Sequence, residues 1–227
     1  MVRRRTLLRA AARGVGLAAL ALACAFLGLV ALWAFAPPVS TLMLARMIEG
    51  RRYERAFVPL KDIAPAAVAS VIASEDVRFC ANDGVDWGAL HEVLSVKGEP
   101  RRGASTITMQ TAKNLFLWPG RSVVRKGIEI PMALVLGKVW SKKRTIETYL
   151  NIAEWGDGIF GVEAAAERYF HKRASQLNAR EGALLATALP NPVRRNPARP
   201  GALQRRLAAG IMARVADTPE LMDCLPK

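Results

Sequence analysis

The longest apolar stretch of the chain lies near its N-terminus and predicts a membrane-spanning helix. Residues 14–36 carry no charged side chain, and this run exceeds the about 20 residues that a spanning helix needs. No acid precedes it, but several arginines do, namely Arg3, Arg4, Arg5, Arg9 and Arg13. Positive charge on this flank places residues 1–13 in the cytoplasm and the rest of the chain on the opposite side.

A cleaved signal peptide is the alternative for this stretch. The apolar region of a signal peptide normally spans only about 7–15 residues and ends at a small-residue cleavage site. The run at 14–36 is longer, and its end carries Trp33, Phe35 and then Pro37. These features favour an anchor that stays attached.

Beyond the anchor, apolar positions recur with helical spacing. Val68, Val71 and Ile72 lie at i, i+3 and i+4, which is one face of a helix. Similar patterns predict helices at about 64–76, 105–116, 123–140, 142–154, 161–170, 179–189 and 201–216. Asn178 suits the cap of the helix that follows it. Few alternating patterns occur, so we expect a mainly α protein.

The same patterns divide the chain into parts. We expect a cytoplasmic basic segment at residues 1–13, a transmembrane anchor at 14–36, a partly helical membrane-proximal stalk at 37–57 and one domain at 58–227. Val96–Gly103 combines glycine, proline and charge, which is typical of a loop.

Two carboxylates occupy unusual places in these helical patterns. Glu75 continues the stripe of Val68 and Ile72, where poor solvation would raise its pKa toward the range useful for proton transfer. The alternative, that Glu75 merely ends a helix and faces water, stays open from this segment alone. Glu129 precedes Pro131, and a proline inside a helix should kink it or start a new one.

Charge and cysteine content narrow the classes of partner. The net charge of +14 suits lipid head groups, phosphates or nucleic acid, and we expect no nucleic acid for a domain outside the cytoplasm. Cys24, Cys80 and Cys224 show no metal-ligand spacing, and the chain has only 2 histidines, so no zinc site is expected. A Cys80–Cys224 bridge and two free thiols both stay open.

Two further segments suggest a site for an oxyanion. Gly103–Gln110 presents the hydroxyls of Ser105, Thr106 and Thr108 at a predicted helix start, which suits phosphate or sugar oxygens, although this motif taken alone favours an ordinary Ser/Thr cap. Lys113, Arg121, Arg125 and Lys126 follow. They form either a pyrophosphate-binding set or a solvated basic face.

The order and spacing of these motifs closely resemble the family 51 glycosyltransferases, the peptidoglycan glycosyltransferases that polymerise lipid II. The motifs are Glu75-Asp76-x-x-Phe79 with Gly84 and Asp86, Gly103-x-Ser105-Thr106-Ile107-Thr108-x-Gln110, Arg125-Lys126-x-x-Glu129, and Lys143-x-x-Ile146-Glu147-x-Tyr149-Leu150-Asn151. The resemblance runs from about residue 50 to about 200. No transpeptidase-like domain follows, so the chain looks like the monofunctional biosynthetic form.

The resemblance implies a lysozyme-like helical fold and a hexosyltransferase reaction. Glu75 would be the base that takes the proton from the 4-hydroxyl of N-acetylglucosamine on the acceptor lipid II. The oxygen would attack the anomeric carbon of the donor's N-acetylmuramic acid, forming a β-1,4 bond with inversion and releasing undecaprenyl diphosphate. Fixed cations would stabilise the charge of that leaving group.

The resemblance also assigns site residues, partners and a location. Glu129 would join Glu75 in the catalytic pair by supporting the donor site. The substrate-binding residues would be Asp76, Phe79, Ser105, Thr106, Gln110, Lys113, Arg121, Arg125 and Lys126. Expected partners are lipid II, the nascent glycan-undecaprenyl diphosphate, the lipid bilayer and other cell-wall synthases. No cofactor is expected to be required, although Mg or Mn would assist the pyrophosphate, and the location would be the inner membrane with a periplasmic domain.

This chain departs from the family pattern at a few positions. Asn82 stands where the family usually has His, Met109 replaces the first residue of a Gln-Gln pair, and Ala104 replaces a second Gly. We expect the usual His to be chiefly structural, because Glu75 and Glu129 are retained. The apolar segment Asn114–Gly120 either dips into the outer leaflet or is a buried connector.

Two other functions fit parts of the sequence. A membrane-anchored lysozyme-like enzyme that cleaves peptidoglycan would also be helical with one critical Glu, but it needs no pyrophosphate site. A non-catalytic scaffold that binds precursors would tolerate the departures at Asn82 and Met109. The basic residues and the anchor favour synthesis.

Overall fold

The computed structural model describes residues 2–95, 104–120 and 122–225. Two compact units, Met1–Ala36 and Pro37–Lys227, make up the chain. The first unit contains one helix, α1 (Val2–Trp33), and its part Ala11–Trp33 is long and apolar enough to cross a membrane. The helix therefore ends at Trp33, ahead of the expected boundary at residue 36, because the segment leads into Pro37 and Pro38.

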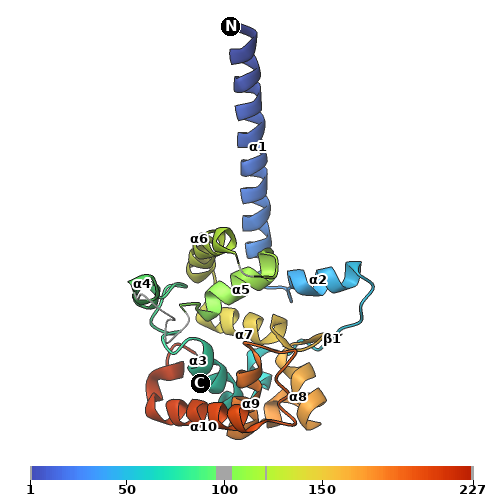
Figure 1. Cartoon of the computed structure of the whole chain (residues 1–227), viewed down its shortest axis with the longest axis vertical. Coiled ribbons are helices and arrows are strands. Elements are labelled where there is room, and N and C mark those ends of the chain that lie inside the picture. The colour runs from blue at the N-terminus through green and yellow to red at the C-terminus, as the bar shows by residue number, and fades with distance from the viewer. Residues whose placement is uncertain (1, 96–103, 121, 226–227) are drawn as a thin grey trace. The chain divides into compact units, whose positions relative to one another are not determined.

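Helices dominate the second unit (Figure 1), which confirms the prediction of a mainly α protein. Its helices are α2 (Thr41–Ile48), α3 (Pro65–Glu75), α4 (Trp87–Ser95), α5 (Ile107–Phe116), α6 (Val123–Val139), α7 (Lys142–Ile152), α8 (Val162–Phe170), α9 (Ala179–Ala188) and α10 (Ala202–Asp217). Single 3₁₀ turns lie at η1 (Leu60–Asp62), η2 (Ala174–Gln176) and η3 (Pro219–Met222). The strands β1 (Glu54–Arg55), β2 (Glu154–Gly156) and β3 (Ile159–Phe160) pair in the order β1-β3-β2.

The helices expected from the sequence are present within a few residues, but other elements were missed. Helix α4 lacks a long apolar stripe, and its start depends on the Asp86 side chain, which accepts a hydrogen bond from the Ala89 amide at 3.1 Å. The strands are too short to show alternation. Helix α6 runs unbroken through Pro131, so no new helix begins there. The loop expected at Val96–Gly103 falls outside the described residues.

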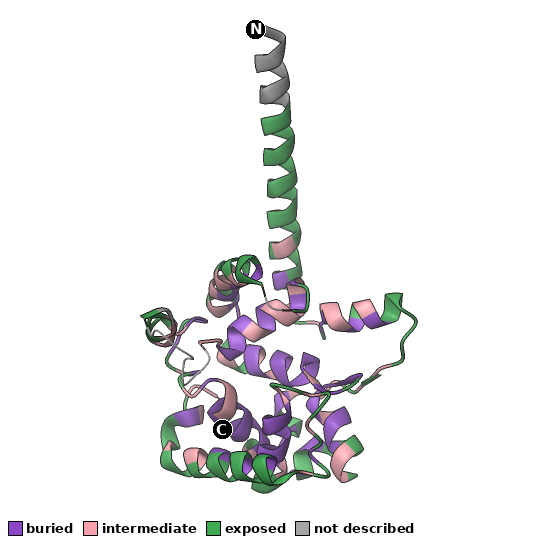
Figure 2. Cartoon of the chain, in the orientation of Figure 1, coloured by how far each residue is buried: buried purple, intermediate pink, exposed green. Residues whose placement is uncertain are grey.

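The core is built on three helices with unusually small side chains. Helix α3 packs against α9, and α10 packs against both. A Cβ atom on Gly182 of α9 would lie 2.7 Å from the Cα of Ala67 on α3, so the two backbones meet at a distance that only glycine permits. Residues of these helices join those of α7 and α8 in the buried interior (Figure 2). The C-terminal end of α3, which carries Glu75, is therefore rigidly held.

Residues 37–57, expected to form a stalk, lie within the second unit. The Thr41 hydroxyl donates hydrogen bonds to the carbonyls of Leu117 at 2.6 Å and Asn114 at 3.2 Å. Arg46 pairs with Glu154 at 3.0 Å, and β1 adds to the small sheet beside β3. This segment is therefore part of the same folded body as the helices that follow.

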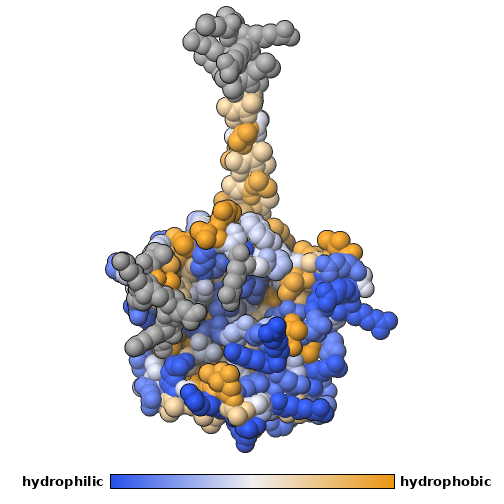
Figure 3. All heavy atoms as spheres, viewed as in Figure 1, coloured by the Kyte–Doolittle hydropathy of each residue, from blue (hydrophilic) through white to orange (hydrophobic). Residues whose placement is uncertain are grey.

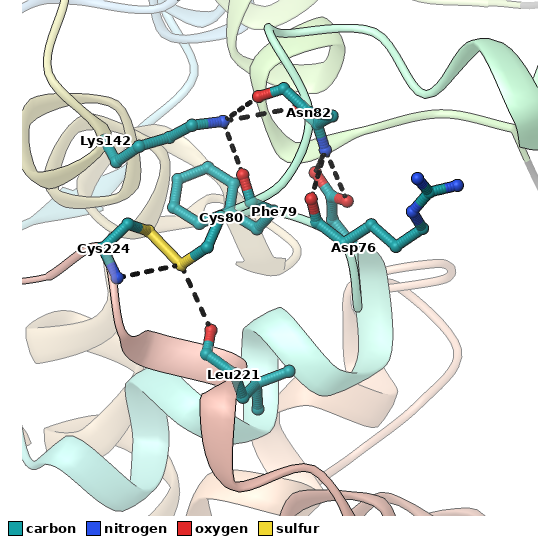
Figure 4. Close-up of a disulfide and its surroundings, with 8 residues drawn as sticks. Asp76, Phe79, Cys80, Asn82, Lys142, Leu221 and Cys224 are labelled. Atoms are coloured by element: carbon teal, nitrogen blue, oxygen red, sulfur yellow. Dashed lines mark hydrogen bonds between the residues drawn. A yellow bond between two sulfur atoms is a disulfide. The ribbon is translucent and has the colours of Figure 1, made fainter.

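A disulfide joins the loop after α3 to the end of the chain. Cys80 and Cys224 are bonded at an S–S distance of 2.05 Å across a sequence separation of 144 residues, and Cys24 is free. The bridge settles the question that the sequence left open. Cys224 also donates its backbone N–H to the Cys80 sulfur at 3.3 Å (Figure 4). The loop beside Glu75 is thus tied covalently to the segment that follows α10.

Replacing both bridged cysteines by serine should lower the free energy of unfolding by about 2–5 kcal/mol, since the open chain regains the conformational entropy of a long loop. Denaturant unfolding of the full chain in detergent would measure the loss. Reduction of the wild-type protein should reproduce it. The matched control is Cys24→Ser, which removes a thiol but no bridge. Equal stability of the double variant and this control would contradict the prediction.

Candidate active site

A pocket of about 390 Å³ opens at the C-terminal end of α3, beside Glu75. It is lined by Ser74, Glu75, Asp76, Val77, Arg78, Asp86, Ala89, Ala104, Ser105, Thr106, Gln110, Pro190 and Arg214. The lining comes from α3, the loop after it, α4, the segment that leads into α5 and α5 itself, and two segments of the C-terminal third. The motifs at Glu75 and at Ser105 therefore meet in space, as the resemblance implied.

Glu75 is half-buried, and hydrogen-bond donors surround its carboxylate. Gln110 Nε2 donates to Oε2 at 2.8 Å, and the Ser74 hydroxyl donates to Oε1 at 3.2 Å. Burial raises the pKa of Glu75, while these two hydrogen bonds and the charges of Lys113 and Arg195 act in the opposite direction. A raised pKa is what the apolar stripe of α3 predicted, and it suits a group that accepts a proton near neutral pH.

The neighbouring Asp76 has a different environment from Glu75. Its carboxylate accepts the Ile107 backbone N–H at 3.1 Å and Asn82 Nδ2 at 3.0 Å. The first of these bonds places negative charge at the N-terminus of α5, where the helix dipole stabilises it. Burial raises the pKa of Asp76 to about 6 in spite of these donors. Asp76 therefore joins the loop after α3 to the start of α5.

Asn82 extends this connection through its side-chain amide (Figure 4). Its Nδ2 also donates to the Arg78 carbonyl at 2.9 Å, and its Oδ1 accepts the Gly84 N–H at 3.0 Å. Lys142 Nζ donates to the carbonyls of Asn82 and Phe79 and lies 4.6 Å from the centre of the Phe79 ring. These contacts agree with the expectation that the position at 82 is structural. Lys142 itself was missed, because nothing in the sequence connects it to a loop so far away.

Gly84 closes the loop under the pocket. Its φ is +105°, and a Cβ atom there would lie 2.5 Å from the Ala133 carbonyl oxygen of α6. The Gly84 carbonyl accepts a hydrogen bond from the Thr106 hydroxyl at 2.6 Å, and that hydroxyl accepts the Met109 N–H at 3.0 Å. The backbone can approach α6 this closely only with glycine at this position. Thr106 thus caps α5 as well as lining the pocket.

A second charged cluster surrounds Glu129 on α6. Glu129 is buried and pairs with Arg125 at 2.8 Å and with Lys126 at 2.8 Å. Lys126 Nζ also donates to the Ser105 hydroxyl at 2.7 Å. This chain of contacts links the Glu129 cluster to the rim of the Glu75 pocket through Ser105.

Lys113 interacts electrostatically with both Glu129 and Glu75. Burial lowers the pKa of its ammonium group, while the negative charges of Glu129 and Glu75 counteract the effect, and Arg125 and Lys126 reinforce it. A desolvated ammonium with cations beside it favours the arrival of an anion. Arg121, which the resemblance adds to this set, lies outside the described residues.

Some residues near the pocket show roles that their sequence positions did not reveal. Phe79 is fully buried and packs beneath Lys142, so its surface is not available to a ligand. Met109 is also fully buried, so this departure from the family pattern falls on the core side of α5. Arg214 on α10 donates to the Ala73 carbonyl at 2.5 Å and lines the pocket. Arg214 lies far beyond the recognised motifs, and no pattern pointed to it.

The described part of the chain lacks a cluster of metal-binding side chains. Within those residues, no group of three or more His, Cys, Asp and Glu side chains could hold a metal ion. The positive charge of the site comes instead from Lys113, Arg125 and Lys126.

The site combines a half-buried carboxylate in a pocket with a desolvated cluster of cations, on a helical scaffold. This combination is typical of an enzyme that removes a proton from one substrate and binds an anionic group of another. The sequence matches the Transglycosylase family over residues 41–216. The chain belongs to this family, which confirms the resemblance drawn from the four motifs.

Curated relatives align over nearly the whole chain. The biosynthetic peptidoglycan transglycosylase of Agrobacterium fabrum is 51% identical over 193 residues, covering 84% of this chain and 85% of that protein. The protein of the same name from Rhizobium meliloti is 50% identical over 211 residues, covering 92% and 89%. That of Nitrobacter winogradskyi is 49% identical over 220 residues, covering 96% and 97%.

The pKa of Asp76 predicts how stability depends on pH. A folded pKa of about 6 against about 3.9 in the unfolded chain makes the protonated form the favourable one in the fold, so stability is fully present below about pH 4 and falls as the pH rises through 6. For this group alone the loss is about 3 kcal/mol.

Denaturant unfolding at pH 4.5 and pH 7.5 would measure this contribution. Asp76→Asn should remove most of the pH dependence, even though it also disturbs the bond to Ile107. Asp62→Asn is the matched control, because Asp62 is exposed on η1 and the wild-type slope should persist. A slope that is the same in Asp76→Asn as in the wild type would contradict the prediction.

Proposed function

We propose that the chain is a biosynthetic peptidoglycan transglycosylase that polymerises lipid II into β-1,4-linked glycan strands and releases undecaprenyl diphosphate. The relatives with this name share about half of their residues with the chain over most of their length. The observation that carries the proposal is the position of Glu75, held by donors in a pocket whose rim connects to a cation cluster.

In this reaction Glu75 acts as the general base. The carboxylate takes the proton from the 4-hydroxyl of N-acetylglucosamine on the acceptor, and the oxygen attacks the anomeric carbon of the donor from the face opposite the leaving group. Inversion follows from this geometry. The raised pKa of Glu75 supports this role, since a base is most effective when its pKa lies near the working pH.

The cation cluster binds the donor pyrophosphate. Lys113, Arg125 and Lys126 supply positive charge where the leaving group gains negative charge, so their interaction strengthens in the transition state. Glu129 holds Arg125 and Lys126 in place through its two ion pairs, and the motif resemblance adds Arg121 to the set. Ser105, Thr106 and Gln110 line the sugar-binding side. Mg or Mn would bind through the pyrophosphate, because the described residues provide no ligand cluster.

The disulfide supports the expected topology. A bridge between Cys80 and Cys224 forms and persists in an oxidising compartment such as the bacterial periplasm. The arginines at the N-terminus favour the cytoplasm for that end. The proposed arrangement is therefore a single-pass inner-membrane protein whose second unit lies in the periplasm, where the glycan is assembled.

Glu75→Gln should reduce polymerisation of lipid II by about 100- to 10,000-fold while leaving lipid II binding intact, because the amide keeps the shape of the side chain but cannot accept the proton. Polymer formation and direct binding of lipid II would be measured on the full chain in detergent. Glu167→Gln, an exposed position on α8, is the matched control. Undiminished polymerisation by Glu75→Gln would rule out Glu75 as the general base.

The same preparation distinguishes the rival functions. A cleaving enzyme would release soluble muropeptides from purified sacculi and form no polymer from lipid II. A scaffold would bind lipid II in both the wild type and the variant and convert it in neither. Polymer from the wild type alone supports the synthase.

Apolar surface gathers over α6 and the end of α2 in the space-filling view, while other parts of this face are largely hydrophilic (Figure 3). Trp118 is 49% exposed, and Val123 and Val124 at the start of α6 are 90% and 71% exposed. These side chains sit beside the basic residues of the proposed donor site. They suit insertion into the outer leaflet, where the lipid tail of the donor resides.

Trp118→Ser combined with Val123→Ser should lower the fraction of an anchor-free protein (residues 37–227) that floats with liposomes by several-fold, since each substitution removes apolar area from the interface. Leu203→Ser on α10 is the matched control, because Leu203 is also exposed. Equal flotation of all three proteins would count against membrane insertion and favour a simple surface loop.

A further inference from the structure

Side chains from three helices meet in one hydrogen-bonded line that ends at Glu75. Tyr149 on α7 donates its hydroxyl to Gln110 Oε1 on α5 at 3.0 Å. Gln110 Nε2 in turn donates to Glu75 Oε2 at the end of α3 at 2.8 Å. Tyr149 is only 1% exposed, so its hydroxyl reaches the site solely through this amide. Residues 75, 110 and 149 belong to three different motifs of the sequence.

The direction of each bond is fixed by the chemistry of its ends. An ionised carboxylate only accepts hydrogen bonds, so the amide must turn its N–H group toward Glu75. The amide oxygen then points to Tyr149, whose hydroxyl must donate. Burial and the charges of Glu75 and Asp76 raise the pKa of Tyr149 well above its ordinary value, so the phenol keeps its proton. The line therefore matches an ionised Glu75 that is ready to accept a proton.

Packing makes this arrangement rigid at each end. Helix α5 packs against α7, and the ring of Tyr149 belongs to the main core. At the other end, Glu75 Oε1 accepts the Ser74 hydroxyl at 3.2 Å, and Glu75 lines the pocket. The interior line therefore holds one oxygen of a carboxylate that borders the space a substrate would occupy.

We propose that Tyr149 and Gln110 are positioning residues for Glu75, with the phenol hydroxyl fixing the orientation of the amide and the amide holding the carboxylate toward the pocket. The proposal rests on the proposed function, in which Glu75 is the base. It gives Gln110 a task besides lining the pocket. It also explains why a buried tyrosine, which touches no substrate, stands at this position of α7.

Other charged groups also act on Glu75, and the test must separate them from this line. Lys113 on α5 and Arg195 after α9 act on its pKa. The charged residues that line the same pocket are Arg214 on α10 and Asp76, Arg78 and Asp86 after α3. None of them is changed by a substitution of Tyr149 or Gln110. The Gln110 hydrogen bond lowers the pKa of Glu75 against the effect of burial, so its loss should raise that pKa.

The experiment follows the titration of Glu75 by NMR on the full chain in detergent, with isotope-labelled glutamate carboxyl carbons. The Glu75 signal is assigned by its loss in Glu75→Gln. Gln110→Met should raise the midpoint by about one pH unit and Tyr149→Phe by about half a unit. The double variant should match Gln110→Met alone, since the hydroxyl acts only through the amide. Tyr169→Phe is the matched control, because that hydroxyl donates to the Trp155 carbonyl at 3.3 Å.

An unchanged midpoint in Tyr149→Phe, or a further rise in the double variant, would overturn the proposal. Should Tyr149→Phe fail to fold, an unchanged midpoint in Gln110→Met overturns it equally. The acid limb of kcat/KM for lipid II polymerisation should move with the midpoint, and KM should stay nearly constant. If the midpoints move as expected while Glu75→Gln still polymerises lipid II, Tyr149 and Gln110 do position Glu75, but Glu75 is not the general base.

Discussion

The carboxylate of Asp76 is the contact on which the rest of the site depends. It accepts hydrogen bonds from the start of α5 and from Asn82, and it follows directly after Glu75 at the end of α3. A buried carboxylate without these donors would cost several kcal/mol. With these hydrogen bonds made, the Asp76 carboxylate fixes the loop after α3 relative to the start of α5. The position of the adjacent Glu75 therefore depends on Asp76.

The two adjacent acids Glu75 and Asp76 have different roles, one in the proposed chemistry and one in holding the structure. The Asp76 carboxylate is buried and bonded to protein donors at the edge of the pocket, whereas Glu75 is only half-buried there and keeps part of its surface open. A similar division holds for the cation cluster, where the buried Glu129 holds Arg125 and Lys126 and Lys113 interacts electrostatically with both Glu129 and Glu75. Buried ion pairs of this kind contribute mainly to arrangement rather than to net stability.

Much of the fold could be predicted from the sequence, because long apolar stripes at helical spacing identify α3, α5, α6 and α9 directly. The start of α9 was also predicted from Asn178, which forms a reciprocal cap with Glu181. Helix α4 and the short strands could not be predicted, because their formation depends on contacts with distant segments. Glu75, Glu129 and the basic residues were identified through ordered motifs. Lys142, Tyr149 and Arg214 act across large sequence separations, and local patterns carry no signal for such contacts.

The disulfide has a consequence for the order of events during biogenesis. In the proposed topology the N-terminus stays in the cytoplasm and the chain beyond the anchor crosses the membrane, so Cys80 would emerge outside the cytoplasm well before Cys224. The loop that carries Asp76 and Asn82 can therefore be locked only after the last residues have crossed and been oxidised. Until then the thiol of Cys80 would be exposed to mispairing, so with this topology maturation of the site would depend on the thiol-oxidising capacity of the compartment as well as on folding.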